Sequence, residues 1–359
     1  MVPSASISRA PCRRSAPQRR TGHAPRRIAV AAAALCVAAV VHAGVDRLAA
    51  ADVRQNLFDA CLVSDTEAWV VGDLGRLFHT TDGAKTWERR PSPTGLSFVA
   101  LACPTPTHLW AAGQGGQILH SSDGGTTWAV QQSGAKRQLL NIAFATAQRG
   151  LAVGDFGTLL RTDDGGATWS PVALPADIVL PPEAAEVVDP GDIVLYGATF
   201  ADPEHAWVVG EFGIILASSD GGRTWQQQAS SVEMSLFGVW FVDAGRGWAV
   251  GLEATLLVTV DGGAHWERQA VETPKGFVLA LYDVEVRGQH GWAVGNSGFL
   301  LHSGDGGTSW QTVKVPVQMG SSWFRGIALR PDGHGHIVGA RGLMLTVDGR
   351  RFMPSKDRL

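Results

Sequence analysis

LWAAGQGGQILHSSDGGTTW, residues 109–128, holds in one stretch the pattern that decides the fold. A short apolar run ends in glycine, a second β-prone run follows, and the turn Asp123-Gly-Gly-Thr-Thr-Trp128 leads into a third. The carboxylate of such a turn can accept hydrogen bonds from the turn's own backbone, and its glycines tolerate positive φ. The closing tryptophan supplies a large ring that can pack between two sheets. The stretch therefore predicts short antiparallel strands separated by tight turns.

The same unit occurs seven times, six times in complete form and once with a final phenylalanine. Successive final aromatic residues are 41, 41, 56, 41, 44 and 42 residues apart, and most of the 13 tryptophans occupy two positions of the unit. Serine or threonine stands two residues before each aspartate, which gives the Asp-box pattern Ser/Thr-x-Asp-x-Gly-x-Thr-Trp. The aspartates and closing aromatic residues are Asp82 and Trp87, Asp123 and Trp128, Asp164 and Trp169, Asp220 and Trp225, Asp261 and Trp266, Asp305 and Trp310, and Asp348 and Phe352.

A period near 42 residues is typical of a propeller blade made of four strands, A to D. In the third copy we expect these strands at 141–144, 150–154, 158–162 and 168–172. The repeats show no sustained helical periodicity, which excludes a helical solenoid of similar period. Closing the blades into a ring removes exposed sheet edges. We predict an all-β, seven-bladed propeller with four-stranded antiparallel blades over residues 57–354.

The N-terminal segment has a different character. Seven arginines precede the first acidic residue, Asp46, and an apolar run at 28–41 leads into the small-residue site Val41-His42-Ala43. This pattern is typical of a secretory signal peptide and predicts cleavage after Ala43. Residues 44–56 would then form a linker and 355–359 a C-terminal tail. The alternative is an uncleaved N-terminal anchor, and in both cases we expect export to a periplasmic or lumenal compartment, peripheral to a membrane.

Removal of residues 1–43 would leave a markedly acidic domain. The segment holds seven of the 30 basic residues and none of the 33 acidic ones, so its loss argues against a nucleic-acid partner. Cys61 and Cys103 remain, each in the opening strand of neighbouring copies. A disulfide is conceivable in an oxidising compartment, but we expect two buried thiols because adjacent blades splay apart and the bond needs close Cα atoms.

Repeated Gly-Trp-Ala-Val-Gly followed by Asp-Gly-Gly-x-Thr-Trp resembles the photosystem II stability/assembly factor family of BNR-repeat propellers. The match extends over about residues 57–352. The resemblance implies a lumenal protein without enzymatic activity that binds a newly made reaction-centre subunit. Relatives from bacteria without a photosystem imply an envelope role. Ala84 replaces a turn glycine and the last copy ends in Arg350-Arg351-Phe352, so the motifs identify the scaffold and not the client.

A carbohydrate-binding or glycosidase/sialidase-like propeller is the alternative, because Asp-box turns also occur in such enzymes. A sialidase-like site needs three arginines and a tyrosine nucleophile, yet the only tyrosines, Tyr196 and Tyr282, are interpreted as packing residues of opening strands. Identical carboxylates around a ring are expected to be structural. We predict no enzymatic activity, no cofactor and no metal, since His334-Gly-His336 lacks further ligands.

Partner binding is expected on the face opposite the Asp-box turns, where the turns between strands B and C and the links between blades emerge. Tight glycine-flanked turns also favour acidic residues for backbone reasons, so both interpretations of the acids stay open. The proline-rich insertion 170–192 is expected to be a binding loop that partly covers the channel mouth. We expect a monomer that binds a protein client, a membrane-complex subunit. The candidate binding residues are Asp73, Asp155, Phe156, Glu211 and Phe212 in turns, and Arg137, Trp323, Phe324 and Arg325 in links.

Overall fold

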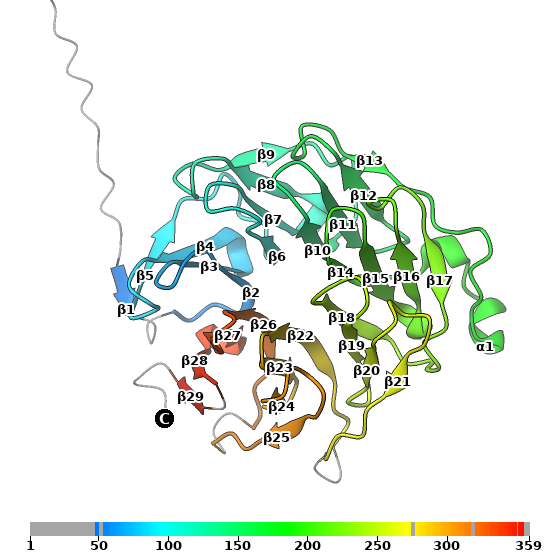
Figure 1. The fold of residues 1–359 in the computed structure, drawn as a ribbon. Coiled ribbons are helices and arrows are strands. Elements are labelled where there is room, and N and C mark those ends of the chain that lie inside the picture. The colour runs from blue at the N-terminus through cyan, green and yellow to red at the C-terminus, as the bar shows by residue number, and fades with distance from the viewer. Residues whose placement is uncertain (1–46, 50–52, 274–276, 317–319, 350, 355–359) are drawn as a thin grey trace, which may run out of the picture. The chain divides into compact units, whose positions relative to one another are not determined.

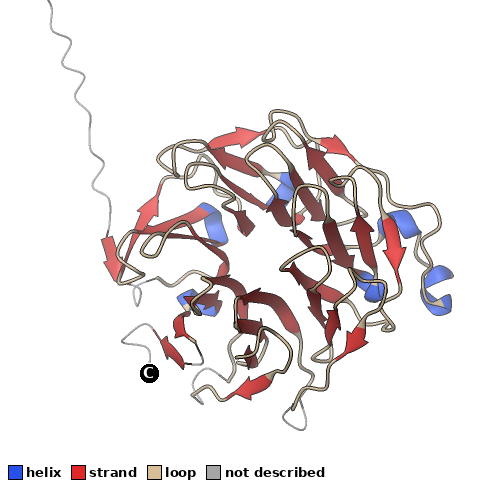
Figure 2. Ribbon diagram, in the orientation of Figure 1, coloured by secondary structure: helices blue, strands red, loops and turns tan. Residues whose placement is uncertain are grey.

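The computed structural model describes residues 47–49, 53–273, 277–316, 320–349 and 351–354. Seven antiparallel sheets follow one another along the chain and form a seven-bladed propeller, so the predicted fold is confirmed (Figure 1). Short helical turns are the only helices among the described residues (Figure 2). None of these helices is long and apolar enough to cross a membrane. The predicted signal peptide and C-terminal tail lie outside the described residues.

Each blade has its four strands in chain order, from strand A beside the channel to strand D at the rim. The strands of blades 1 to 4 are β2 (Leu57–Leu62), β3 (Ala68–Gly72), β4 (Arg76–Thr80), β5 (Thr86–Arg90); β6 (Phe98–Ala102), β7 (Leu109–Gly113), β8 (Ile118–Ser121), β9 (Ala129–Gln131); β10 (Leu139–Phe144), β11 (Gly150–Gly154), β12 (Leu159–Thr162), β13 (Ser170–Pro171); and β14 (Leu195–Phe200), β15 (Ala206–Gly210), β16 (Ile215–Ser218), β17 (Gln226–Gln228). The strands of blades 5 to 7 are β18 (Leu236–Phe241), β19 (Gly247–Gly251), β20 (Leu256–Thr259), β21 (Glu267–Arg268); β22 (Leu281–Arg287), β23 (His290–Gly295), β24 (Leu300–Ser303), β25 (Gln311–Val313); and β26 (Phe324–Leu329), β27 (His334–Gly339), β28 (Met344–Asp348), β29 (Arg351–Pro354).

Blade 1 carries a fifth strand that was not expected. Strand β1 (Arg47–Ala49) pairs antiparallel with the outer strand β5, with Leu48 opposite Trp87, so the predicted linker 44–56 contains regular structure. This pairing covers backbone groups that a free strand edge would expose. The helical elements are α1 (Pro182–Ala185) and the 3-10 turns η2 (Asp73–Gly75), η3 (Gln114–Gly116), η4 (Pro190–Asp192), η5 (Glu211–Gly213) and η7 (Ala340–Gly342).

The hydrophobic core lies between the blades. Seven clusters of buried residues are present, and each draws its members from two adjacent blades. Strand B of each blade is sandwiched on both faces; in β19, for example, every residue is buried. Two-sided burial explains why these strands read as continuous apolar runs and not as alternating ones. Each leucine or valine buried there contributes about 1.5–3 kcal/mol.

The Asp-box turns hold each blade together and attach it to its neighbour. In blade 6, Asp305 accepts hydrogen bonds from the Ser309 N–H at 2.9 Å, the Ser309 hydroxyl at 2.6 Å and the Ser303 hydroxyl at 2.7 Å. The Trp248 indole N–H of blade 5 donates to the Gly307 carbonyl of this turn at 2.9 Å. A Cβ on Gly307 would lie 2.4 Å from that indole, so the turn requires glycine. The bond from the backbone N–H four residues on recurs at Asp82, Asp123, Asp164, Asp220, Asp261 and Asp305.

Blades 7 and 1 close the ring without sharing a strand, as the sequence predicts. Strand β26 packs beside β2, and polar contacts flank the seam on either side. The Arg330 guanidinium pairs with the Asp65 carboxylate at 3.1 Å, and the Arg341 N–H donates to the Asn56 side-chain carbonyl at 3.0 Å. The two ends of the repeat array are therefore joined by packing and polar contacts.

Candidate functional site

The inner strands of all seven blades surround a central channel of about 660 Å³. Each inner strand has a β-bulge near its first residue, and a bulge leaves one residue unpaired and redirects its side chain. These unpaired residues are half-buried and line the channel. We define them as the channel collar: Phe58, Val99, Leu140, Tyr196, Phe237, Tyr282 and Arg325.

Aromatic rings occupy one continuous part of the collar. The Tyr196 and Phe237 rings of blades 4 and 5 meet edge to face with centroids 4.9 Å apart, and the Phe237 and Tyr282 rings follow at 5.7 Å. Edge-to-face and tilted ring pairs of this kind are favourable beyond the area they bury. Both tyrosines pack on Phe237, in agreement with their interpretation as packing residues, and both also line the channel.

Arg325 is the cationic member of the collar. Its guanidinium lies 5.9 Å from the centroid of the Phe58 ring of the next blade, and the Trp323 ring, also of blade 7, stacks on Phe58 with centroids 5.6 Å apart. Burial lowers the pKa of Arg325, while the charges of Asp59 and Asp283 act in the opposite sense. An arginine side chain remains protonated in proteins, so the collar holds a fixed positive charge beside aromatic surface.

Three carboxylates in the channel wall, those of Asp59, Asp283 and Glu285, join the inner strands of adjacent blades. Asp59 accepts a hydrogen bond from the Leu101 N–H at 2.7 Å, and Asp283 accepts one from the Ile327 N–H at 3.2 Å. Burial raises the pKa of Asp59 to about 7, although its backbone hydrogen bonds and Arg325 favour the ionised form. Burial, and then the charges of Asp59 and Glu285, raise the pKa of Asp283 well above its usual range.

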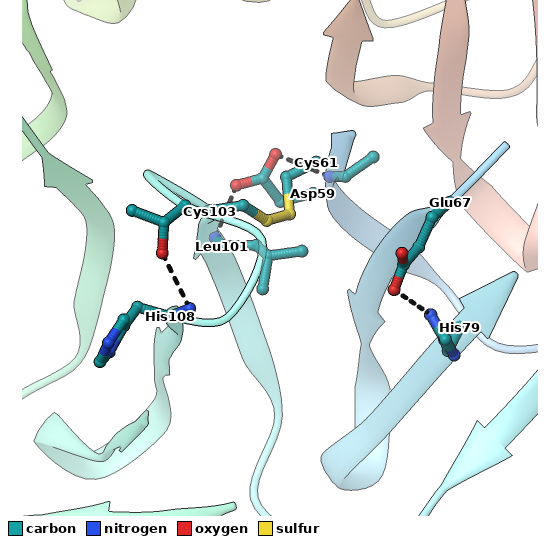
Figure 3. Close-up of a disulfide and its surroundings, with 9 residues drawn as sticks. Asp59, Cys61, Glu67, His79, Leu101, Cys103 and His108 are labelled. Atoms are coloured by element: carbon teal, nitrogen blue, oxygen red, sulfur yellow. Dashed lines mark hydrogen bonds and ion pairs between the residues drawn. A yellow bond between two sulfur atoms is a disulfide. The ribbon is translucent and has the colours of Figure 1, made fainter. Parts of the chain in front are cut away.

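Cys61 and Cys103 form a disulfide between blades 1 and 2, beside Asp59 (Figure 3). Their Cα atoms are 6.2 Å apart, within the range that a disulfide spans. The expectation of two free thiols is therefore wrong. It rested on the divergence of adjacent blades, but blades diverge toward the rim and lie close together at the channel, where both cysteines sit.

The turns between strands B and C share one face with the links that precede strand A. In blade 4, for example, the Glu211 N–H donates to the Val194 carbonyl of the link at 3.0 Å. We refer to this surface as the B–C face and to the opposite one as the Asp-box face. The channel collar lies at the first residues of strand A and so adjoins the B–C face.

The tips of the B–C turns carry bulky residues in a left-handed backbone conformation. Leu74 has φ 58° and is 64% exposed, and Phe156 has φ 53° and is 53% exposed. Phe212 shares this conformation, with φ 56°, and is half-buried. Such residues rarely adopt positive φ, which favours glycine or asparagine. Strain of this kind, paired with exposed apolar side chains, is typical of a binding surface.

Two of the acidic residues predicted to bind a partner, Asp73 and Glu211, form hydrogen bonds within the fold. The Asp73 carboxylate accepts the Asn56 N–H at 3.3 Å, and the Glu211 carboxylate accepts the Val194 N–H at 2.8 Å. Each thereby holds the link that leads into its inner strand. This supports the backbone explanation of their acidity. Asp155 occupies the same turn position in blade 3, where its N–H donates to the Gln138 carbonyl at 3.1 Å.

The other predicted residues fall into two places. The Arg137 guanidinium lies 4.5 Å from the Phe156 ring, so these two form one exposed contact on the B–C face. Trp323 and Arg325 both contact the ring of Phe58, which belongs to the channel collar. Phe324 is fully buried in the core between blades 6 and 7, so its assignment to partner binding is wrong. It opens strand β26, and neighbouring side chains there face different environments.

The insertion 170–192 does not cover the channel mouth. The Val179 N–H donates to the Gln227 side-chain carbonyl at 2.7 Å, and the Gln227 amide returns a bond to the Val179 carbonyl at 3.0 Å. Gln227 belongs to β17, the outer strand of blade 4, and α1 lies beside that strand (Figure 1). Ile178, Leu180 and Ala184 are buried against blades 3 and 4, which explains why the insertion stays at the rim.

Sequence analysis missed the collar apart from Arg325. The signal was present: opening strands align as Leu57-Phe58-Asp59, Leu195-Tyr196-Gly197 and Phe324-Arg325-Gly326. In each triplet the first residue is large and apolar, and the third is often small or short and polar. The middle residue, which belongs to the collar, varies freely between copies. Only the bulge shows that this variable residue lines the channel.

Comparison with known proteins supports the resemblance expected from the repeats. Residues 225–322 match the model of the family described as photosynthesis system II assembly factor YCF48, which confirms that resemblance. No curated protein matches the chain in sequence.

Solved structures share the fold at low sequence identity. YCF48 bound to a D1 peptide is 20% identical, with a TM-score of 0.65, over 85% of this chain and 94% of that one. YCF48 from Cyanidioschyzon merolae is 20% identical, with a TM-score of 0.66, over 83% and 96%. The GH74 xyloglucanase from Xanthomonas campestris is 16% identical, with a TM-score of 0.65, over 86% of this chain but only 54% of that enzyme.

Proposed function

We propose that this protein is a non-catalytic binding propeller that holds a segment of a protein client, a membrane-complex subunit, on its B–C face. The observation that carries the proposal is the set of exposed apolar tips in strained turns, Leu74 and Phe156 among them, on the face that adjoins an aromatic collar. The match to the YCF48 family model supports it. So does the similar fold of YCF48, which has been seen with a D1 peptide bound.

Export is part of the proposal and has two supports. The N-terminal sequence has the arginine-rich and apolar segments of a signal peptide, ending at Ala43. The disulfide between Cys61 and Cys103 fits a protein that matures in an oxidising compartment. We propose a monomer that acts in the periplasm or a lumenal compartment, peripheral to the membrane.

Absence of catalysis is proposed because the carboxylates of both regions are engaged by the fold. Asp59 and Asp283 each accept two backbone N–H groups in the channel wall. Hydrogen bonds from Ser309 hold the pKa of Asp305 at about 2, so this Asp-box residue is a poor proton acceptor at neutral pH. A general acid or base needs a free carboxyl with a suitable pKa within reach of a substrate.

A glycan-binding propeller is the second candidate, because the collar offers a specific observation in its favour. Tyr196, Phe237 and Tyr282 present a row of aromatic rings at the channel, and ring faces can pack against the apolar faces of sugars. Paired carboxylates that project into the channel would strengthen this reading. Asp59 and Asp283 instead bind the backbone of neighbouring blades.

The test uses variants that remove the apolar tips without harming the fold. Leu74→Asn and Phe156→Asn together replace exposed apolar side chains by a residue that accepts positive φ. Tagged, exported protein is used to capture clients from solubilised envelope membranes, and the captured proteins are identified by mass spectrometry. We expect a membrane-complex subunit that is retained by the wild type and lost, by about tenfold or more, from the double variant.

Val260→Ser is the matched control, since Val260 is an apolar residue 75% exposed on the Asp-box face. It should capture as much client as the wild type. Equal capture by the wild type and the double variant would overturn the proposed binding face. Specific binding of arrayed glycans without any captured protein would replace the client proposal by the glycan-binding one.

A further inference from the structure

We propose that the channel collar is a binding pocket for a carboxylate attached to an apolar group, with Arg325 pairing with the carboxylate and the collar rings covering the apolar part. In the client this group would be an aspartate or glutamate side chain next to a hydrophobic residue. The assignment to a client rests on the function proposed above. The ligand chemistry rests on the collar alone.

Arg325 is available to a ligand. No hydrogen bond or ion pair joins its guanidinium to another of the described residues, and its contact with Phe58 uses only the ring face. The two nearby acids, Asp59 and Asp283, have other hydrogen-bond partners. Asp59 and Asp283 are each held by two backbone N–H groups, at distances between 2.7 and 3.2 Å. A guanidinium offers five N–H donors in a planar fork that suits a carboxylate, so an incoming carboxylate would satisfy several of them.

The surroundings of Arg325 favour a ligand that is both charged and apolar. Going round the ring, Arg325 of blade 7 stands between Tyr282 of blade 6 and Phe58 of blade 1. Phe237 and Tyr196 continue the aromatic row over blades 5 and 4. A carboxylate bound among such groups loses water on one side, and the attraction between opposite charges is stronger there than in water. An apolar group next to the carboxylate would pack on the rings and gain from burial.

Charge and size both restrict the ligand. A cationic group would be repelled by Arg325, and the carboxyls of Asp59 and Asp283 are already occupied by backbone N–H groups. An uncharged group would leave the Arg325 guanidinium without a counter-charge in a partly desolvated site. The channel volume of about 660 Å³ lies within the range of small-ligand pockets, about 300–1,000 Å³, and suits a few side chains rather than a folded domain.

The experiment uses 3-phenylpropionate as the probe, with 3-phenylpropan-1-ol as its uncharged counterpart. Binding to the purified protein is measured by saturation-transfer NMR and calorimetry. We expect the wild type to bind the carboxylate at least about tenfold more tightly than the alcohol. Arg325→Met should lose this preference, and Arg325→Lys should keep part of it because the charge remains.

Arg137→Met is the matched control. Arg137 also lies over a phenylalanine ring, at 4.5 Å, on the B–C face, but outside the channel. It should bind the probe like the wild type. Retention of the carboxylate preference by folded Arg325→Met would overturn the proposal. If Arg325→Met does not fold, the comparison of carboxylate and alcohol on the wild type, together with Phe58→Leu, decides: equal binding of both compounds overturns it.

Failure of this inference can be told apart from failure of the proposed function. Client capture that depends on Leu74 and Phe156, without any binding of 3-phenylpropionate, would retain the client-binding face and reject the pocket. A pocket that binds the probe, in a protein whose client capture is unaffected by Arg325→Met, would reject the acidic client side chain as its occupant.

Discussion

Carboxylates occur in two regions of the propeller, in the Asp-box turns and in the inner strands of blades 1 and 6, and they behave in opposite ways. Asp305, in an Asp-box turn, is exposed, accepts bonds from Ser309 and Ser303, and has its pKa lowered to about 2. Asp59, in the channel wall, is enclosed by neighbouring blades and has its pKa raised to about 7. The turn stabilises the ionised carboxylate through hydrogen bonds, whereas the channel destabilises it through burial.

The comparison shows which positions of the repeat can vary between copies. Positions that recur in all or nearly all copies, such as the Asp-box aspartate and glycines, serve the turn and the contact with the neighbouring blade. Positions that vary between copies line the channel or form the tips of the B–C turns, as Arg325 and Phe156 do. A propeller family can thus keep its scaffold while changing what its central channel and B–C face bind.

The largest expected effect comes from removing a repeated aromatic residue. Trp248 is fully buried and its indole donates to Gly307 of the next blade, so Trp248→Ala should lower the free energy of unfolding by about 3–5 kcal/mol. Trp323 is half-buried and stacks on Phe58 at the channel, so Trp323→Ala should cost less than half as much. Chemical denaturation of both variants measures the difference. Equal losses would show that the channel region contributes as much to stability as the repeated contacts.

The disulfide is expected to give the next largest effect, and it tests the channel region alone. Cys61 and Cys103 are 42 residues apart and join strand β2 of blade 1 to the residue that follows β6 of blade 2. Replacing both by serine should lower the free energy of unfolding by about 2–4 kcal/mol, because the cross-link restricts the unfolded chain. Thermal melting with and without a reductant provides the control: the wild type should respond to reduction and the double variant should not. A wild type that melts alike in both conditions would contradict the prediction.

Most of the fold could be predicted from the sequence, because the repeat is a local signal. The Asp-Gly-Gly-x-Thr-Trp turns fixed the blade number, and the third copy has strands at Leu139–Phe144 and Gly150–Gly154, close to those expected. The candidate site was harder to predict from the sequence. Burial of Phe324, the bulge at Arg325 and the approach of Cys61 to Cys103 depend on how neighbouring blades meet, and no local pattern encodes that contact. The position of the insertion 170–192 was predicted wrongly for the same reason, because its apolar residues pack against blades 3 and 4 only once these blades are assembled.

The opposite pKa shifts predict opposite responses to pH. Asp305 contributes stability above its unfolded pKa of 3.8 and loses it as pH falls through about 2. Asp59 contributes stability below 3.8 and loses it as pH rises through about 7, because the folded protein must then hold a buried charge. Asp59→Asn should therefore raise the melting temperature relative to the wild type more at pH 8.5 than at pH 5. Asp305→Asn should lower the melting temperature at both pH values.

Melting curves at these two pH values, recorded for the wild type and both variants, provide the measurement. The informative quantity is the difference between variant and wild type at each pH, since other groups titrate in both proteins. A benefit of Asp59→Asn that is the same at pH 5 and pH 8.5 would contradict the raised pKa. It would also remove the reason for treating the two carboxylate regions as opposites.

The smallest effect concerns backbone strain on the two faces. The Asp-box turns place glycine at nearly all their left-handed positions, and Ala84 of blade 1, with φ 65°, departs from this rule. Leu74 departs from it on the B–C face, with φ 58°. Ala84→Gly and Leu74→Asn should each raise the free energy of unfolding by about 0.5–1 kcal/mol, because each substitution relieves a left-handed strain. Only Leu74→Asn should also weaken client capture, since Leu74 is exposed on the binding face. A loss of capture with Ala84→Gly, measured beside chemical denaturation, would show that strain itself, and not the apolar tip, links the turns to binding.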